Sequence, residues 1–269
     1  MGVLDRIVAH KREELAGRTR QTPLAEMRRR AADAPPARPF HQALLGPDTG
    51  PAGVRLIAEV KGSSPSAGTI RAEFDPVAIA RTYAVSGAAA VSVLTDARFF
   101  AGADDHLTRV RAAVDVPVLR KDFIVDPYQV YEARAIGADA VLLIVAVLDR
   151  GAVADLASLA AELDMAALVE AHTEAEVGAA LDVRAALLGI NNRNLDTLET
   201  SLEVTRRLRP LVPAGVTVVA ESGIEERRDV EEMGRLGVQA VLVGTALMRS
   251  ADPGARVREL LGVPAGRGA

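Results

Sequence analysis

Three near-copies of one short segment decide the fold of this chain: Ser86-Gly-Ala-Ala-Ala-Val91, Ile136-Gly-Ala-Asp-Ala-Val141 and Leu236-Gly-Val-Gln-Ala-Val241. In each copy a glycine follows a segment with helical spacing and precedes a short apolar run. Glycine in this place is typical of the left-handed residue that ends a helix. Each copy is therefore predicted to lead from a helix into a strand, as in a repeating βα unit.

Eight short apolar runs of the kind found in buried strands recur along the chain. Most are continuously hydrophobic rather than alternating, as expected for parallel strands covered by helices. They begin roughly every 20 to 35 residues, the size of one βα unit. The pattern predicts an α/β fold, a (β/α)8 TIM barrel, with an open doubly wound sheet as the alternative. No Gly-x-Gly-x-x-Gly follows the first run, which disfavours a dinucleotide-binding sheet. The runs are Arg55–Val60, Ala89–Leu94, Val116–Arg120, Ala138–Val145, Ala166–Glu170, Ala186–Asn191, Val216–Glu221 and Val238–Gly244.

Capping residues mark where helices are expected to begin. Three Asp-Pro pairs place a capping carboxylate before a proline suited to the first helical position. Thr173 with Glu176, and Thr200 with Glu203, have the spacing of a capping box. The Asp-Pro pairs begin at Asp75, Asp126 and Asp252.

Residues 1–54 precede the first strand and are predicted to form a helical extension of a barrel at 55–262, the whole chain being one domain. Leu4, Ile7, Val8 and Leu15 share one helical face. Pro23 opens a second helix that ends at the Ala-Pro-Pro of 34–36. The extension forms either a lid over one barrel end or a stabilising collar, and the sequence favours neither.

Composition excludes several classes of protein. The 269 residues include no cysteine, which excludes a disulfide framework, a thiolate zinc site and a cysteine nucleophile. The net charge is −4 and aromatic residues make up 3%, so neither a basic surface nor a base-stacking platform for nucleic acid is expected. No apolar run reaches membrane-spanning length. We expect a cytoplasmic monomer. No metal is expected, because the histidines lack metal-ligand spacing; these are His10, His41, His106 and His172.

Ionisable side chains stand at the ends of five predicted strands, where the chemistry of such barrels is located. Because side chains alternate along a strand, Glu59 and Lys61 share one face. Lysines and carboxylates brought together shift one another's pKa values, as general acids and bases require, although a static ring of ion pairs is the alternative. The charged and amide residues are Glu59, Lys61, Arg120, Lys121, Asp122, Glu170, His172, Asn191, Asn192, Arg193 and Glu221.

The ends of the last two strands predict a phosphate site. Ser222 and Gly223 follow the seventh strand, and Gly244 and Thr245 end the eighth. Loops at these two places commonly hold phosphate in this fold through backbone N–H groups, and glycine allows a close approach of the backbone. A small phosphorylated molecule is therefore the expected partner.

Five motifs in order resemble the indole-3-glycerol phosphate synthase family. They are Ile-Ala-Glu-Val-Lys-Gly-Ser-Ser-Pro-Ser at 57–66, Val-Leu-Arg-Lys-Asp-Phe-Ile at 118–124, Leu-Val-Glu-Ala-His at 168–172, Gly-Ile-Asn-Asn-Arg-Asn-Leu at 189–195 and Ala-Glu-Ser-Gly-Ile at 220–224. Each lies at a predicted strand end, and the likeness extends from the first helix through Arg249. The resemblance implies ring closure of 1-(2-carboxyphenylamino)-1-deoxyribulose 5-phosphate, with loss of carbon dioxide and water, and no cofactor.

The resemblance also implies roles for individual residues. Lys121 is the general acid at the ribulose carbonyl, which would be favoured if burial and neighbouring cations lower its pKa. Lys61 holds the substrate carboxylate and takes part in later steps. Glu170 and Glu59 are bases or proton carriers for dehydration. Glu221 and Asn191 orient the lysines and the sugar hydroxyls. Phe100 and Phe123 form the aromatic wall of the ring pocket. The residues around the phosphate are Ser64, Arg193, Ser222, Gly223, Gly244 and Thr245.

Several positions depart from the family pattern without removing a catalytic group. Gly62 and Ser63 replace basic residues, and Ala67 replaces a usual lysine. These changes affect the expected substrate affinity more than the assignment. The alternatives are another phosphate-binding barrel enzyme, a variant substrate, and a catalytically silent barrel; the last would be expected to lack Lys121 or Glu170.

Overall fold

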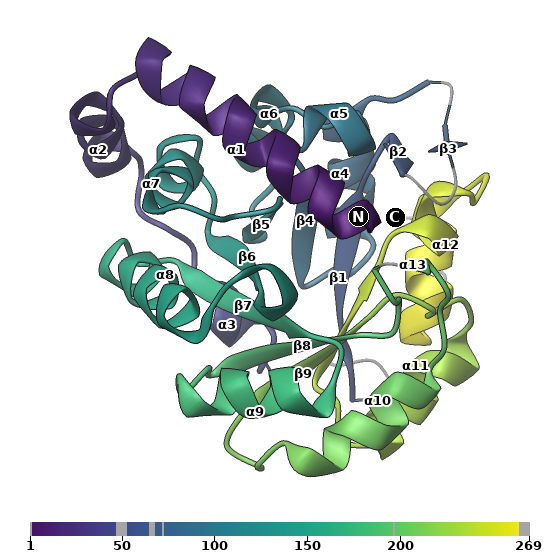
Figure 1. Cartoon of the computed structure of the whole chain (residues 1–269). Helices are drawn as coiled ribbons and strands as arrows, with labels where there is room; N and C mark the ends of the chain where they lie inside the picture. Colours follow the sequence, from purple (N-terminus) through teal and green to yellow (C-terminus); the bar gives the residue numbers. More distant parts are fainter. Residues whose placement is uncertain (1, 47–52, 65–67, 72, 196, 264–269) are drawn as a thin grey trace.

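Eight parallel strands close into a barrel in the computed structural model, which describes residues 2–46, 53–64, 68–71, 73–195 and 197–263 (Figure 1). The order around the barrel is β1-β10-β9-β8-β7-β6-β5-β4. Every predicted strand is present with ends shifted by at most two residues, and the open sheet is excluded because β1 pairs with both β10 and β4. The strands are β1 Arg55–Val60, β4 Ala90–Leu94, β5 Val118–Lys121, β6 Ala140–Ile144, β7 Ala166–Ala171, β8 Leu187–Asn191, β9 Thr217–Glu221 and β10 Ala240–Val243.

Helices cover the outside of the barrel between successive strands (Figure 1). The main ones are α4 Pro76–Val85, α6 Asp104–Ala113, α7 Pro127–Ala135, α8 Arg150–Glu162, α9 Glu174–Asp182, α10 Glu203–Leu208, α11 Arg227–Arg235 and α13 Pro253–Leu261. Short elements lie at the strand ends: a hairpin of β2 Ser63–Ser64 and β3 Gly68–Thr69, helices α5 Ala97–Phe100 and α12 Thr245–Met248, and 3-10 turns η1 Val145–Val147 and η2 Arg209–Leu211. Pro65, Ser66 and Ala67 lie outside the described residues.

The predicted helix signals are confirmed with one exception. The three Asp-Pro aspartates cap α4, α7 and α13, and Thr173 Oγ1 accepts the Glu176 N–H at the start of α9. Gly87, Gly137 and Gly237 end helices with positive φ. The expected helix start at Thr200 is wrong, because Thr200 pairs in a bridge with Arg193 and α10 begins only at Glu203.

Two buried layers explain the continuously hydrophobic strands. One layer packs the outer strand faces against the helices, and the other fills the barrel interior. Along β1, Ile57 points inward while Leu56 and Ala58 point to the helices. The same alternation turns Glu59 and Lys61 into the barrel mouth, since they follow Ile57 at steps of two.

The N-terminal extension covers both ends of the barrel. Helix α1 (Val3–Gln21) lies over the end where the strands finish, and α2 (Leu24–Asp33) packs on α7. Helix α3 (Phe40–Ala43) closes the opposite end, where His41 Nε2 lies 2.8 Å from Oγ1 of Thr217, the first residue of β9. The extension is therefore more than a collar, because Val3, Leu4 and Ile7 of α1 line the pocket described below. No helix in the described ranges is long and apolar enough to cross a membrane.

Candidate active site

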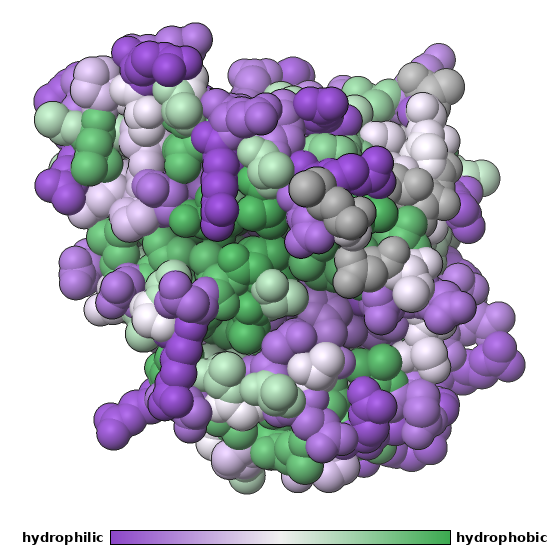
Figure 2. Space-filling model, viewed as in Figure 1, coloured by the Kyte–Doolittle hydropathy of each residue, from purple (hydrophilic) through white to green (hydrophobic). Residues whose placement is uncertain are grey.

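A pocket of about 310 Å³ opens at the carboxyl ends of the strands. Its walls are charged on the side of β1, β5, β7 and β9, and apolar where Leu4 and Ile7 of α1 face Leu142 and Ile144 of β6. Figure 2 shows hydrophobic residues gathered on the surface between α1 and α8. The pocket brings together all the residues to which the family resemblance gives a role, whereas Arg120, Asn192 and His172 of the predicted strand ends do not line it. The residues with a role are Glu59, Lys61, Ser64, Phe100, Lys121, Phe123, Glu170, Asn191, Arg193, Glu221, Ser222, Gly223, Gly244 and Thr245.

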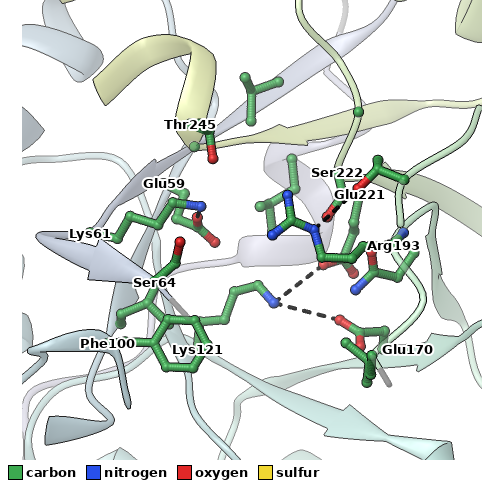
Figure 3. A pocket seen from close by; sticks show the side chains of 18 of the residues that line it. Glu59, Lys61, Ser64, Phe100, Lys121, Glu170, Arg193, Glu221, Ser222 and Thr245 are labelled. Atoms are coloured by element: carbon green, nitrogen blue, oxygen red, sulfur yellow. Dashed lines mark hydrogen bonds and ion pairs between the residues drawn. The ribbon is translucent and has the colours of Figure 1, made fainter. Parts of the chain in front are cut away.

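Lys121, the last residue of β5, lies between two carboxylates (Figure 3). Its Nζ is 3.5 Å from Glu170 Oε2 and 3.5 Å from Glu221 Oε2. Burial works to lower the pKa of Lys121, but Glu170, Glu221 and Glu59 together raise it above the ordinary lysine value. The condition that neighbouring cations lower the pKa of Lys121 is therefore not met, because its close neighbours are carboxylates. Lys121 carries its proton through the neutral range.

The two carboxylates beside Lys121 differ in their affinity for protons. Burial and the negative charge of Glu170 raise the pKa of Glu221 well above its usual range. Burial also disfavours the ionised form of Glu170, but Lys121 and His172 outweigh it and lower the pKa of Glu170. One lysine faces two buried carboxylates, so Glu221 keeps its proton to higher pH than Glu170.

A second ion pair lies at the carboxyl end of β1, between Glu59 and the residue that follows the strand. Lys61 Nζ is 2.6 Å from Glu59 Oε1, and Figure 3 shows the pair facing the pocket beside Lys121. Burial would raise the pKa of Glu59, but Lys61 and Lys121 lower it, so Glu59 is ionised. A static ion-pair ring accounts for these contacts but not for the cavity that they surround.

The loops after β9 and β10 form the polar end of the pocket. Ser222 and Gly223 both have positive φ, 63° and 77°, and Gly244 immediately precedes α12. The Ser222 carbonyl accepts a hydrogen bond from Asn192 Nδ2 at 3.0 Å, which fixes the first loop. Thr245, Arg193 and Ser64 line the same pocket, together with Arg249, a residue outside the motifs that sequence reasoning used.

An aromatic pair forms another wall. The rings of Phe100 and Phe123 are 6.0 Å apart between centroids and inclined at 35°. Aspartates hold the loops that carry them: Asp96 Oδ1 accepts the Phe99 N–H at 2.7 Å, and Asp122 Oδ1 accepts the Phe123 N–H at 2.8 Å. Both aspartates also contact Lys11 of α1.

Sequence reasoning missed two groups of functional residues. Lys11 is 3% exposed on the same face of α1 as Ile7, although the predicted apolar face did not include it. Leu142 and Ile144 were expected only as residues of the strand core. Both line the pocket, near the carboxyl end of β6. Their positions at a strand's carboxyl end were the available signal.

His172, one of the histidines that lack metal-ligand spacing, contacts Glu170. Its Nε2 is 3.4 Å from Glu170 Oε1, and its ring does not line the pocket. Within the described residues no cluster of three or more histidines and carboxylates has a geometry that could hold a metal ion.

The closed barrel and its charged pocket define a (β/α)8-barrel enzyme site. Residues 4–260 match the model of the family described as indole-3-glycerol phosphate synthase. The chain belongs to the indole-3-glycerol phosphate synthase family.

Individual relatives agree with this assignment. The indole-3-glycerol phosphate synthase of Bordetella pertussis is 51% identical over 260 residues, covering 96% of this chain and 98% of its own length. That of Laribacter hongkongensis is 50% identical with the same coverage of both chains. Among solved structures, 3-hexulose-6-phosphate synthase from Salmonella typhimurium shares the fold, with a TM-score of 0.63, 15% identity, and 78% and 97% of the two chains covered.

Proposed function

We propose that this chain catalyses ring closure of 1-(2-carboxyphenylamino)-1-deoxyribulose 5-phosphate to indole-3-glycerol phosphate, as a decarboxylating carbon-carbon lyase of tryptophan biosynthesis. Lys121 carries this proposal, because a protonated lysine between two buried carboxylates is a proton donor held in one place. The family and the names of the relatives support the same reaction.

The pocket offers a matching surface for each part of this substrate. Backbone N–H groups around Gly223 and Gly244, with Ser64, Arg193, Ser222 and Thr245, bind the phosphate at the polar end. Phe100 and Phe123 contact the carboxyphenyl ring, and Lys61 pairs with its carboxylate. These contacts orient the ring carbon toward the ribulose carbonyl, so that binding energy from the two ends of the substrate aligns the reacting atoms between them.

Bond formation needs a proton on the ribulose carbonyl oxygen as the ring carbon attacks. Lys121 supplies it, and its positive charge stabilises the oxygen as negative charge develops there. Glu221 and Asn191 hold Lys121 and the sugar hydroxyls in position. Loss of carbon dioxide then returns the electron pair of the broken bond to the ring and restores aromaticity, so the step requires no cofactor as an electron sink.

Dehydration completes the reaction and needs one acid and one base. The hydroxyl made from the carbonyl oxygen leaves as water after taking a proton, and the neighbouring carbon loses one. Glu170 and Glu59 line the pocket together with Lys121, and both serve as bases or carriers of these protons. Their lowered pKa values keep them in the carboxylate form that accepts a proton.

The direct test is to mix the purified protein with this substrate in metal-free buffer and follow indole fluorescence. A rise that saturates with substrate concentration is expected. Binding without a rise supports the silent barrel or a variant substrate instead, and neither binding nor turnover favours another phosphate-binding barrel enzyme. Competition by inorganic phosphate tests the loops at Gly223 and Gly244, and its absence at high phosphate counts against that site.

We further propose that the chain acts as a monomer in the cytoplasm. Away from the pocket, the exposed large apolar residues of the described ranges stand on separate elements rather than in one patch, which supports a surface without a partner. They are Leu24, Leu45, Val85, Leu211 and Val263. Light scattering that gives the mass of one chain is the expected result, and the mass of two chains contradicts it.

A further inference from the structure

His172 stands directly behind Glu170, on the side away from the pocket. Glu170 lies in β7, which ends at Ala171, and His172 follows the strand directly. Glu170 presents a different oxygen to each neighbour: Oε2 is 3.5 Å from Lys121 Nζ, and Oε1 is 3.4 Å from His172 Nε2. One carboxyl group thus joins the proton donor of the pocket to a histidine outside it.

The contacts continue from His172 toward solvent. Glu176 Oε2 is 3.2 Å from His172 Nδ1 and accepts the His172 backbone N–H at 2.8 Å. The exposed fraction of the side chain rises along this line, from 1% for Glu170 to 12% for His172 and 19% for Glu176. Lys121, Glu170, His172 and Glu176 therefore form a continuous line of titratable groups from the pocket to the surface.

The proposed reaction gives such a line a use, because it consumes one proton per turnover. The carbonyl oxygen gains a proton when the ring closes. The substrate carboxylate leaves as neutral carbon dioxide and returns none. During dehydration the site gives one proton to the leaving hydroxyl and takes one from the neighbouring carbon. This step therefore leaves the number of protons in the site unchanged. Each turnover therefore leaves Lys121 and the carboxylates short of one proton, which solvent must replace before the next turnover.

We propose that His172 is the proton donor that reloads this site, with Glu176 as the residue that positions and charges it; the inference rests on the proposed function. The imidazolium gives its Nε2 proton to Glu170 Oε1, and Glu170 returns a proton from Oε2 to Lys121. The neutral ring keeps the proton on Nδ1, held by Glu176. A change of tautomer and a proton taken up on the Glu176 side restore the imidazolium.

The charges around the ring suit this role. Burial lowers the pKa of His172, but the hydrogen bond to Glu176 and the charges of Glu170 and Glu176 raise it above the ordinary histidine value, while Lys121 opposes them. Imidazolium is therefore present at neutral pH, as a donor of this kind needs. His172 Nε2 has no hydrogen-bond partner among the described residues, so no other acceptor competes with Glu170 Oε1 for its proton.

The first experiment compares His172→Ala with His41→Ala, a histidine at the opposite end of the barrel. We expect kcat of His172→Ala at neutral pH to fall at least about tenfold with little change in KM, and added imidazole to restore it. His41→Ala keeps its kcat and gains nothing from imidazole. A kcat of His172→Ala equal to that of the unsubstituted protein, or a loss that imidazole does not relieve, overturns the proposal.

A second variant leaves the ring in place. Glu176→Gln keeps an oxygen that can accept the His172 backbone N–H but removes the charge that favours imidazolium. The pH of maximal kcat should move to lower values, because a less basic His172 is protonated only at lower pH. An unchanged pH profile overturns the proposal. Absence of turnover in the unsubstituted protein is a different result, since it overturns the proposed function and this inference with it.

Discussion

Lys11 Nζ lies 3.0 Å from Asp122 Oδ1, joining helix α1 of the N-terminal extension to the residue that follows Lys121. The same ammonium group is 2.9 Å from Asp96 Oδ2 and 2.9 Å from Glu14 Oε2. Asp122 and Asp96 each bind a backbone N–H in the two loops that carry the aromatic residues. One buried lysine thus fixes α1 over the pocket and connects it to both segments that carry the aromatic residues.

Replacement of Lys11 by methionine should destabilise the protein and weaken substrate binding. Asp96 and Asp122 are buried, and without Lys11 their charges lose a direct partner, which costs about 3 kcal/mol or more when one member of a buried pair is removed. The free energy of unfolding from urea titration should fall by that amount, and KM should rise as the aromatic wall loosens. The neighbouring exposed Arg12→Met is the control and should change neither quantity.

The pKa of Asp122 reports on the same anchor. Burial would raise it, but Arg120 and Lys11 lower it to about 2. If Lys11→Met left both the free energy of unfolding and the acid stability unchanged, the ion pair would have no role in holding α1.

Lys121→Ala should lower turnover at least about a hundredfold, the scale of general acid catalysis. Substrate contacts at the phosphate and the ring remain, so KM should change much less than kcat. Because the surrounding carboxylates raise the pKa of Lys121, loss of its proton should produce no fall in activity near neutral pH. Steady-state fluorescence of the indole product across pH checks both points. Near-normal turnover of the variant would mean that another group donates the proton.

The fold and the site differ in how far they could be predicted. The alternation of side chains along β1 and the position of its carboxyl end were enough to place Glu59 and Lys61 in the barrel mouth. Both features can be inferred from the local periodicity of the sequence. Lys11 could not be found this way, because its partners Asp96 and Asp122 are distant in sequence and an isolated lysine on a helix is ordinarily solvated. Thr200 was misread because its pairing with Arg193 competes with the capping pattern.

The charge state of the site was also beyond sequence reasoning. The same residues allow either a lowered or a raised lysine pKa, and the outcome depends on which neighbours come within a few ångströms. In the folded chain, Lys121 meets Glu170 and Glu221 rather than Lys61. Distances of this kind are set by the closed barrel, which brings β5, β7 and β9 to one mouth.

Glu221→Gln should stabilise the protein more at high pH than at low pH. In the unfolded chain a glutamate ionises near pH 4.3, whereas burial and Glu170 raise the pKa of Glu221 in the folded state. The contribution of Glu221 to stability therefore falls as pH rises above about 4, until the raised folded pKa is passed. Glutamine does not titrate, so the difference in Tm between variant and wild type should grow in favour of the variant from pH 4 to 8. A constant difference would show that Glu221 ionises normally.

Gly189→Ala should displace Glu221, because a methyl group on Gly189 would overlap Glu221 Oε1 and lie 3.4 Å from Leu168 Cδ1. Overpacking of this kind costs about 1–3 kcal/mol, and turnover should fall as Glu221 moves away from Lys121. Gly178→Ala is the matched control: it lies in α9 with nothing within 4 Å of the added carbon, so it should stabilise the helix by about 0.5–1 kcal/mol. The decisive comparison is in the Glu221→Ala background, where the clash is absent. There the stability cost of Gly189→Ala should largely disappear, and a cost that persists undiminished would place its origin in the strand rather than in Glu221.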